Sequence, residues 1–208
     1  MDLTVIKNIV FDLGGVLLTL DRECSVNRFV GLGLKNADEL LDCYHQEGVF
    51  LRLEEGSLSP AEFHDAIRKE AGVYIRNKDI DWAWRGFIVE MPVYKLKMLE
   101  RLRERGYRLY LLSNTNPFVM NWAMSPFFSP NYKPISDYFD KLYLSYQMKC
   151  VKPNQIIFDK MIADSGMKPS ETLFVDDGVA NIEMGKQLGF KTYLAKNGED
   201  FREIFNLY

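Results

Sequence analysis

Short apolar runs that end in polar residues or glycine recur along the chain. Four of them are brief and rich in apolar residues, which is typical of strands buried in a parallel sheet. The predicted strands cover residues 6–11, 107–112, 172–175 and 191–195. The first run stops at Asp12, and two glycines follow soon after it and permit a tight turn. A carboxylate is therefore expected at the carboxyl end of the first strand.

Apolar residues at helical spacing separate the later strands. Three leucines share one face of a helix predicted for residues 94–105, and two more helices are predicted for residues 154–165 and 181–188. Glycine follows each helix closely, and it is favoured there because it readily adopts a positive φ. From residue 94 onward the predicted order is therefore α-β-α-β-α-β.

This alternation predicts the α/β fold class, with a doubly wound parallel sheet covered by helices on both faces, because parallel strands need crossover connections. The pattern changes between residues 20 and 90, where we predict only helices and no strand. We therefore expect a core domain made of residues 1–19 and 91–208, and a small inserted helical cap domain made of residues 20–90. The chain, at 208 residues, is too short for several further domains.

Two segments of the insertion resemble helix N-termini. Each has a capping residue with a glutamate three positions later, as in Asn36 to Glu39 and in Ser59 to Glu62. In the second segment, proline follows the capping residue, which is a favoured position for proline at the start of a helix. Both segments support a helical insertion.

Composition and charge exclude several classes of protein. There are 26 basic and 29 acidic residues, so the net charge of −3 offers no field that would attract nucleic acid or anionic lipid. The longest uncharged stretch, residues 109–132, is interrupted by serine and proline and is not a membrane helix. Three separated cysteines and the absence of a basic export signal predict a cytoplasmic protein with reduced thiols. The oligomeric state stays open.

Polar residues follow the predicted strands at their carboxyl ends, where ligands bind in open parallel sheets. They are Asp12, the pair Ser113 and Asn114, and the pair Asp176 and Asp177, with Lys152 at the start of the helix before the last pair. Carboxylates suit Mg²⁺, and Lys152 suits an anion such as phosphate. Each motif alone also has an ordinary explanation, as a turn, a helix cap or a solvated lysine.

Taken in order, the four motifs resemble those of the haloacid dehalogenase (HAD) superfamily of hydrolases. The motifs here are Ile-Val-Phe-Asp-Leu-Gly-Gly around Asp12, Leu-Leu-Ser-Asn around Ser113, Lys-Pro at Lys152, and Leu-Phe-Val-Asp-Asp ending at Asp177. The insertion resembles the C1 cap of that superfamily. The chain is similar to the subgroup that includes α-D-glucose-1-phosphate phosphatase and the N-terminal phosphatase domain of soluble epoxide hydrolase.

The resemblance implies a role for each matching residue. Asp12 is implied as the catalytic nucleophile that forms an aspartyl-phosphate, and Lys152 as the cation that offsets its charge. Ser113 and Asn114 are implied to bind phosphoryl oxygens. A Mg²⁺ cofactor is implied on Asp12, Asp177 and the backbone carbonyl of the residue at position 14, with Asp176 as a direct ligand or a holder of a metal-bound water. The metal-binding residues that the resemblance implies are thus Asp12, Gly14, Asp176 and Asp177.

One position departs from the usual phosphatase pattern. Gly14 stands where the family has a second aspartate, which serves as general acid and base and typically contributes about 10²–10⁴ in rate. Asp21 could reach the site as a substitute, or it could simply cap a helix. His45 and His64 both fall in the insertion, where packing or surface roles are favoured. Three aromatic residues there, Trp82, Trp84 and Phe87, are expected to pack in the cap or to line the site.

The leading hypothesis is a Mg²⁺-dependent phosphatase that acts on a small phosphorylated metabolite, a sugar phosphate, through a covalent intermediate on Asp12. One alternative, suggested by Gly14, is a catalytically degenerate member that binds a phosphorylated ligand or a protein partner. Another is a 2-haloacid dehalogenase, which the paired acids Asp176 and Asp177 disfavour because a metal site serves phosphate better than halide. The partner in the leading hypothesis is a small molecule, with no nucleic acid and no membrane.

Overall fold

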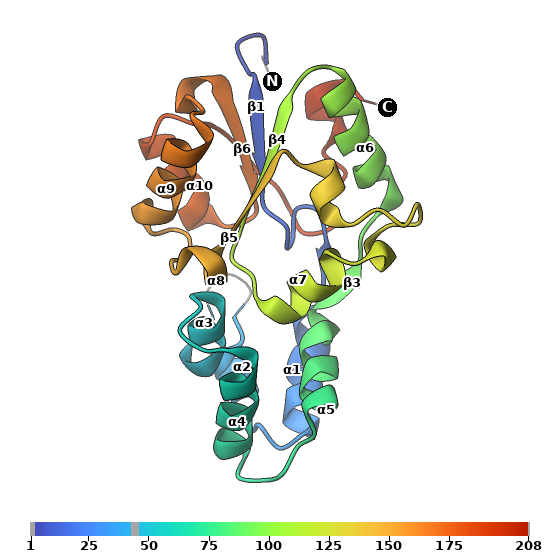
Figure 1. The fold of residues 1–208 in the computed structure, drawn as a ribbon, viewed down its shortest axis with the longest axis vertical. Coiled ribbons are helices and arrows are strands. Elements are labelled where there is room, and N and C mark those ends of the chain that lie inside the picture. Colours follow the sequence, from blue (N-terminus) through green and yellow to red (C-terminus); the bar gives the residue numbers. More distant parts are fainter. Residues whose placement is uncertain (1–2, 43–45, 208) are drawn as a thin grey trace.

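A five-stranded parallel sheet forms the centre of the larger part of the molecule (Figure 1). The computed structural model describes residues 3–42 and 46–207. The strand order is β5-β4-β1-β6-β7, so the first strand lies in the middle. The strands are β1 (Asn8–Phe11), β4 (Arg108–Ser113), β5 (Lys141–Leu144), β6 (Thr172–Asp176) and β7 (Lys191–Leu194).

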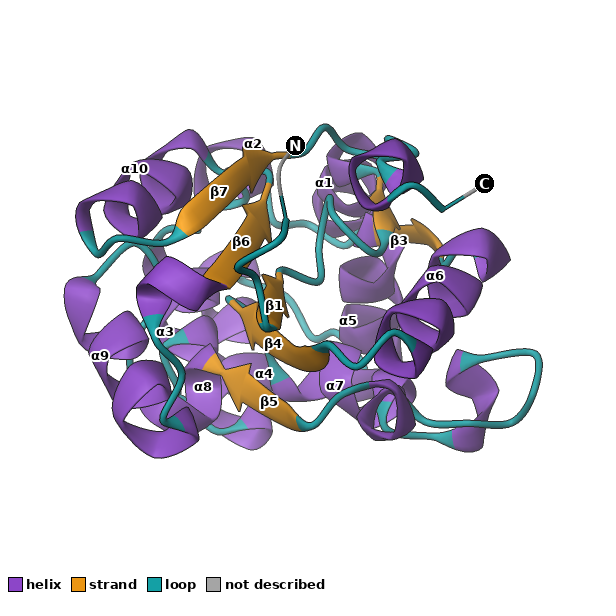
Figure 2. Cartoon of the chain, turned by 90° about the horizontal axis from the view of Figure 1, so that it is seen from above, coloured by secondary structure: helices purple, strands orange, loops and turns teal. Residues whose placement is uncertain are grey.

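Helices cover both faces of this sheet (Figure 2). Alternate residues of each central strand point to opposite faces, so Ile9 and Phe11 of β1 pack in one apolar cluster with Leu99, and Val10 packs in another with Phe158. The helices of this part are α6 (Val93–Glu104), α7 (Pro117–Ala123), α8 (Ser145–Met148), α9 (Gln155–Ser165) and α10 (Val179–Gln187). The predicted doubly wound α/β fold is confirmed.

The sequence missed one strand of the sheet. The four predicted strands are present, but no strand was predicted at the position of β5. Its four residues are flanked by Asp140 and Ser145, and two of them are not fully buried, so the run lacks the continuous apolar character of the central strands. As the edge strand beside β4, it needs to be buried less than they are.

The insertion forms an apolar cluster of its own, below the sheet in Figure 1. Phe50 is at its centre, stacked on Trp84 with ring centroids 4.9 Å apart and edge-on to Phe29 at 5.1 Å. The division of the chain at residues 20 and 90 stays a prediction. The helices are α1 (Arg22–Gly31), α2 (Ala37–Leu40), α3 (Gly48–Glu54), α4 (Pro60–Ala71) and α5 (Asn77–Trp84).

The expectation that residues 20–90 are wholly helical is wrong. The chain enters the cap through β2 (Thr19–Leu20) and returns through β3 (Ile88–Glu90), and these two short strands pair with each other. The pairing is too brief for a period of two to be visible in the sequence. Asn197 fixes the entry strand, because its side-chain amide exchanges hydrogen bonds with the backbone N–H and C=O of Leu20 at 2.9 and 2.8 Å.

The two predicted helix N-termini have different outcomes. Ser59 and Glu62 form the predicted reciprocal capping box at the start of α4. Asn36 precedes α2 as predicted, but its side chain makes no capping hydrogen bond and instead donates to Glu70 at 2.9 Å. The remaining short helices are 3₁₀ turns, η1 (Arg85–Phe87), η2 (Pro126–Phe128), η3 (Ile135–Tyr138), η4 (Pro169–Glu171) and η5 (Arg202–Phe205).

A bilayer-spanning helix would need about 20 apolar residues. No helix in residues 3–42 and 46–207 is long and apolar enough to meet this requirement.

Candidate active site

Asp12 lies directly after β1, the central strand, at the carboxyl edge of the sheet. Its backbone N–H extends the sheet by donating to Val175 at 2.9 Å. The side chain is buried, and its Oδ1 accepts hydrogen bonds from the N–H of Leu13 at 2.7 Å and is 3.0 Å from the Nζ of Lys152. Two donors on one oxygen fix the orientation of the carboxylate.

The turn after Asp12 passes close to the end of β6 because Gly15 has no side chain. Its φ is +69°, and a Cβ built there would lie 1.9 Å from Oδ2 of Asp177. Any other residue would therefore push the turn away from Asp177. The second of the two glycines after the first strand thus lets two carboxylates come together.

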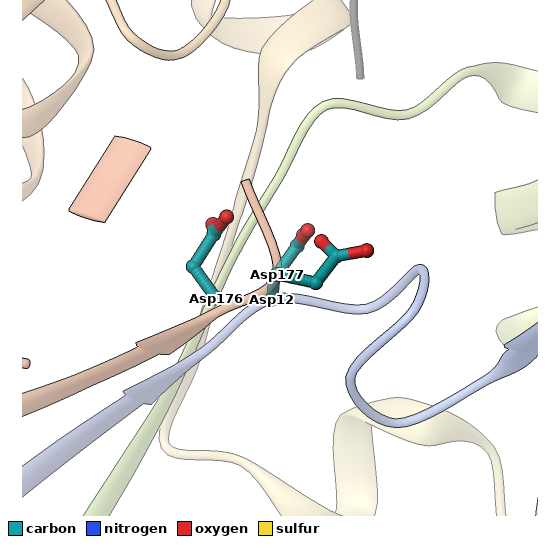
Figure 3. A group of neighbouring side chains, drawn as sticks. All are labelled: Asp12, Asp176 and Asp177. Atoms are coloured by element: carbon teal, nitrogen blue, oxygen red, sulfur yellow. The ribbon is translucent and has the colours of Figure 1, made fainter. Parts of the chain in front are cut away.

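Three carboxylates meet at this edge of the sheet (Figure 3). One oxygen each from Asp12, Asp176 and Asp177 lies within 4.8 Å of the others. Burial and the charge of Asp176 raise the pKa of Asp12 to about 6 against the opposing charge of Lys152. Burial and the charges of Asp12 and Asp176 raise the pKa of Asp177 to about 7. This repulsion favours a cation between them.

The donor set fits Mg²⁺. Carboxylate oxygens are hard ligands, and a small site with a few of them leaves room for water and phosphate in the coordination sphere of Mg²⁺. Gly14 lines the same cavity as Asp12 and Asp177. The family resemblance implies its backbone carbonyl as a further ligand. The ligand assignment itself stays a prediction.

Lys152 is buried and held at three points. Its Nζ donates to Asp176 Oδ2 at 2.6 Å and to the Leu112 carbonyl at 2.9 Å, in addition to facing Asp12. Burial alone would lower the pKa of Lys152, but the adjacent charges of Asp12 and Asp176 raise it above its ordinary value. The ammonium group is therefore always charged at neutral pH.

Asp176 differs from the other two acids in its partners. Its Oδ1 accepts from the N–H of Gly178 and the side-chain amide of Asn181, both at 2.8 Å, while its Oδ2 accepts from Lys152. Both oxygens therefore have donors in the protein. Of the two roles considered for Asp176, the indirect one agrees better with these contacts, and the position of Lys152 depends on it.

The two predicted phosphate-binding residues also lie at the site. Ser113 ends β4, and both Ser113 and Asn114 line the cavity with Asp12 and Lys152. The amide of Asn114 forms two hydrogen bonds with the backbone of Lys152, donating at 3.0 Å and accepting at 2.7 Å. Asn114 therefore positions Lys152 across the sheet edge, a contact that the sequence did not suggest.

Three further candidates from the sequence, Asp21, His64 and Trp82, do not line the cavity. Asp21 is the N-cap of α1 and accepts from Cys24 at 3.0 Å, so the helix-cap interpretation is correct. His64 is buried against Phe118 and pairs with Asp81 at 2.7 Å. His45 lies outside the described residues. Trp82 is half-exposed under Arg28.

The cap contributes several residues to the cavity. Two of the three aromatic residues that were expected to pack in the cap or to line the site, Trp84 and Phe87, line the cavity. Glu54, which the sequence analysis missed, lines it as well. Burial and the charge of Asp12 raise the pKa of Glu54 to about 8, against the opposing charge of Lys152. The missing acid at Gly14 was the signal that a carboxyl from another segment was needed.

Comparison with protein families gives one match over most of the chain. Residues 6–189 match the model described as "haloacid dehalogenase-like hydrolase". A relative named D-ribitol-5-phosphate phosphatase, from Bacteroides thetaiotaomicron, is 53% identical over 199 residues, which is 96% of each chain.

Solved structures give the same picture. A predicted HAD-like family hydrolase from Porphyromonas gingivalis has a TM-score of 0.93 and 46% identity, covering 98% of this chain and 97% of its own. A HAD family enzyme from Bacteroides thetaiotaomicron, in complex with magnesium and inorganic phosphate, has a TM-score of 0.88 and 43% identity, covering 96% of this chain and 99% of its own.

Proposed function

Because the chain belongs to the haloacid dehalogenase-like hydrolase family, we propose that it is a Mg²⁺-dependent phosphatase that hydrolyses a small sugar or sugar-alcohol phosphate. The observation that carries the proposal is the buried meeting of Asp12, Asp177 and Lys152 in one cavity. It combines a fixed carboxylate, a cation-binding group of oxygens and a permanent positive charge. These are the groups that transfer of a phosphoryl dianion to a carboxylate requires.

Asp12 attacks phosphorus, the bond from phosphorus to the leaving alcohol breaks, and an aspartyl-phosphate forms. Water then attacks phosphorus, which releases inorganic phosphate and restores the carboxylate. Lys152 offsets the negative charge that both reactants bring, and Ser113 donates to a phosphoryl oxygen. Mg²⁺ held by Asp12, Asp177 and the Gly14 carbonyl would supply further positive charge to the phosphoryl group.

The substrate class is supported by the relative named D-ribitol-5-phosphate phosphatase and by two polar atoms of the cap. Oε1 of Gln46 and Nε1 of Trp84 are buried without a hydrogen-bond partner in the described part of the chain, and both residues line the cavity. Such groups are costly unless a ligand pairs with them. An acceptor and a donor suit the hydroxyl groups of a sugar or a polyol.

The two alternatives fit the site less well. A dehalogenase has no use for three carboxylates gathered within 4.8 Å, because a halide leaves without help from a cation. A degenerate binding protein would not need the carboxylate of Asp12 to be held by two donors. It would also not need Lys152 to be held beside Asp12 by three acceptors. The glycine at position 14 removes one acid but leaves these groups in place.

The test is a panel of substrates assayed with Mg²⁺, with EDTA, and with the variant Asp12→Asn. D-Ribitol 5-phosphate, glucose 1-phosphate and 2-chloropropionate separate the three hypotheses. We expect hydrolysis of at least one of the phosphates, its loss in EDTA, and a fall of about 10⁴-fold or more in Asp12→Asn, because removal of a nucleophile typically has this effect. Phosphate hydrolysis that survives both EDTA and Asp12→Asn would contradict the proposal, as would release of chloride alone.

A further inference from the structure

We propose that Glu54, at the end of cap helix α3, is the general acid that protonates the leaving alcohol and then the general base that activates water. It would perform the work for which Gly14 has no side chain. This inference rests on the proposed phosphatase function. It concerns a residue in a segment far from all four sequence motifs.

The backbone around Glu54 is fixed on the carboxyl edge of the sheet. Oγ of Ser145, at the start of α8, donates to the Glu54 carbonyl at 2.6 Å and accepts from the N–H of Thr115 at 3.0 Å. Nζ of Lys149 donates to the carbonyl of Gly56. Gly56 has a φ of +71°, and a Cβ there would lie 2.1 Å from the Tyr146 carbonyl. The end of α3 is therefore in direct backbone contact with the core.

The side chain of Glu54 is directed by Asn116, the N-cap of α7. Oδ1 of Asn116 accepts from the N–H groups of Phe118 and Val119 at 3.1 and 3.2 Å, so its NH₂ end is the part that can donate to the Glu54 carboxyl. Thr115 and Asn116 follow the Ser113 and Asn114 motif directly. The loop that carries the phosphate-binding residues thus holds the backbone and the side chain of Glu54.

Glu54 and Asp12 line the same cavity, and the charge of Asp12 acts on the pKa of Glu54. The charged groups that act on Glu54 are Asp12, which raises its pKa, and Lys152, which lowers it, after burial as the largest cause. Lys149 is engaged by the Gly56 carbonyl on the opposite side of the turn. With a pKa of about 8, Glu54 is protonated at neutral pH and has a proton to give.

The two steps balance. In the first, Asp12 forms a bond to phosphorus, the bond from phosphorus to the bridging oxygen breaks, and the Glu54 proton moves to that oxygen. In the second, water attacks phosphorus, its proton moves to the Glu54 carboxylate, and the bond from phosphorus to Asp12 breaks. The products are an alcohol and inorganic phosphate, and both carboxyl groups return to their starting states.

The experiment compares Glu54→Gln with wild-type protein on two substrates, with the first step measured in a single turnover. D-Ribitol 5-phosphate has a poor leaving alcohol that needs a proton, whereas 4-nitrophenyl phosphate has a leaving group that does not. We expect phosphoryl transfer from the alkyl ester to fall by about 10²–10³-fold, and the burst of nitrophenol to keep its rate. Steady-state turnover should slow for both substrates, and phosphoenzyme should accumulate from 4-nitrophenyl phosphate.

A matched control is Glu47→Gln, at the other end of α3, where the side chain is exposed and makes no capping hydrogen bond. It should leave both rates unchanged. A second test adds Gly14→Asp to Glu54→Gln. A Cβ at Gly14 would lie 3.0 Å from the end of the Leu20 side chain, which can move, so the aspartate is accommodated. It should restore part of the lost transfer from the alkyl ester.

An equal fall in transfer from both substrates would overturn the proposal, since it would mean that Glu54 only holds the site together. No fall with either substrate would overturn it as well. If Glu54→Gln does not fold by circular dichroism, Glu54→Asp keeps the acid and must show the same selective loss in a milder form. Wild-type protein that hydrolyses no phosphate ester would instead overturn the proposed function.

Discussion

The strand ends of the sheet and the last turn of α3 meet in one cavity, but they are built in different ways. At the strand ends, Asp12 and Lys152 are fixed by the regular parallel strands and by short-range hydrogen bonds to neighbouring backbone. Glu54 reaches the cavity only because the cap contacts the core through Ser145 and Gly56. The difference teaches that the proposed nucleophile is positioned by the sheet, whereas the proposed acid is positioned by an interface between cap and core.

The largest loss of function that we expect at the strand ends comes from Lys152→Met. It leaves Asp12 and Asp176 as buried carboxylates without their shared cation, so we expect a loss of activity of about 10²-fold or more and a loss of stability of about 3–5 kcal/mol. Denaturant unfolding and a kcat measurement check both. Lys186→Met, on the exposed pair with Glu183, is the control and should change neither. Full activity in Lys152→Met would contradict the role proposed for the positive charge of Lys152.

Ser145→Ala tests the contact between the cap and the core. It removes the hydroxyl that lies between the Glu54 carbonyl and the N–H of Thr115. Because Glu54 would then be less well positioned, we expect the transfer from D-ribitol 5-phosphate to fall by about 10-fold, in line with a lost hydrogen bond of 1–2 kcal/mol. Transfer from 4-nitrophenyl phosphate should change much less. Equal losses on the two substrates would mean that Ser145 supports the whole site and not the cap contact alone.

A smaller effect is expected from Trp84→Phe, which keeps the ring stacked on Phe50 and removes the buried N–H. If a substrate hydroxyl pairs with this N–H, KM for a polyol phosphate should rise by about 5–10-fold, the cost of one hydrogen bond. KM for 4-nitrophenyl phosphate, which has no hydroxyl on its ring, should stay the same. A KM that rises equally for both would point to a change in the shape of the cavity.

The last prediction concerns stability and pH. The pKa of Glu54 is raised from 4.5 to about 8 in the folded chain, so the native state holds the proton more tightly than the unfolded state. The contribution of Glu54 to stability is therefore present below about pH 4.5 and is lost as pH rises to about 8. The melting temperature of Glu54→Gln relative to wild type should therefore rise as the pH is raised from 5 to 9. A constant difference would contradict the raised pKa.

The sequence was informative about the sheet because buried strands leave continuous apolar runs, and the polar residues at their ends stand out against those runs. Asp12, Ser113 and Asp177 were found in this way, and Lys152 was found from its place in the order of the motifs. The structure brings all four to one cavity. The edge strand β5 was missed because partial exposure removes that contrast.

The cap was less predictable for the same reason. Glu54 sits beside Glu55 near the end of a short helix, where a glutamate normally faces solvent, and nothing local distinguishes it from its neighbours. Its burial depends on Ser145 and Asn116, which lie more than sixty residues later in the chain. Asp21 looked like the better candidate because of its place near the first motif, but its side chain caps α1.

The most direct measurement is mass spectrometry of Glu54→Gln after brief reaction with 4-nitrophenyl phosphate and Mg²⁺. If the strand ends supply the nucleophile and Glu54 supplies the base for the second step, one phosphoryl group should accumulate per chain, and peptide mapping should place it on Asp12. Wild-type protein treated in the same way should carry much less. A phosphoryl group on another residue, or an equal amount on both proteins, would contradict this division of roles.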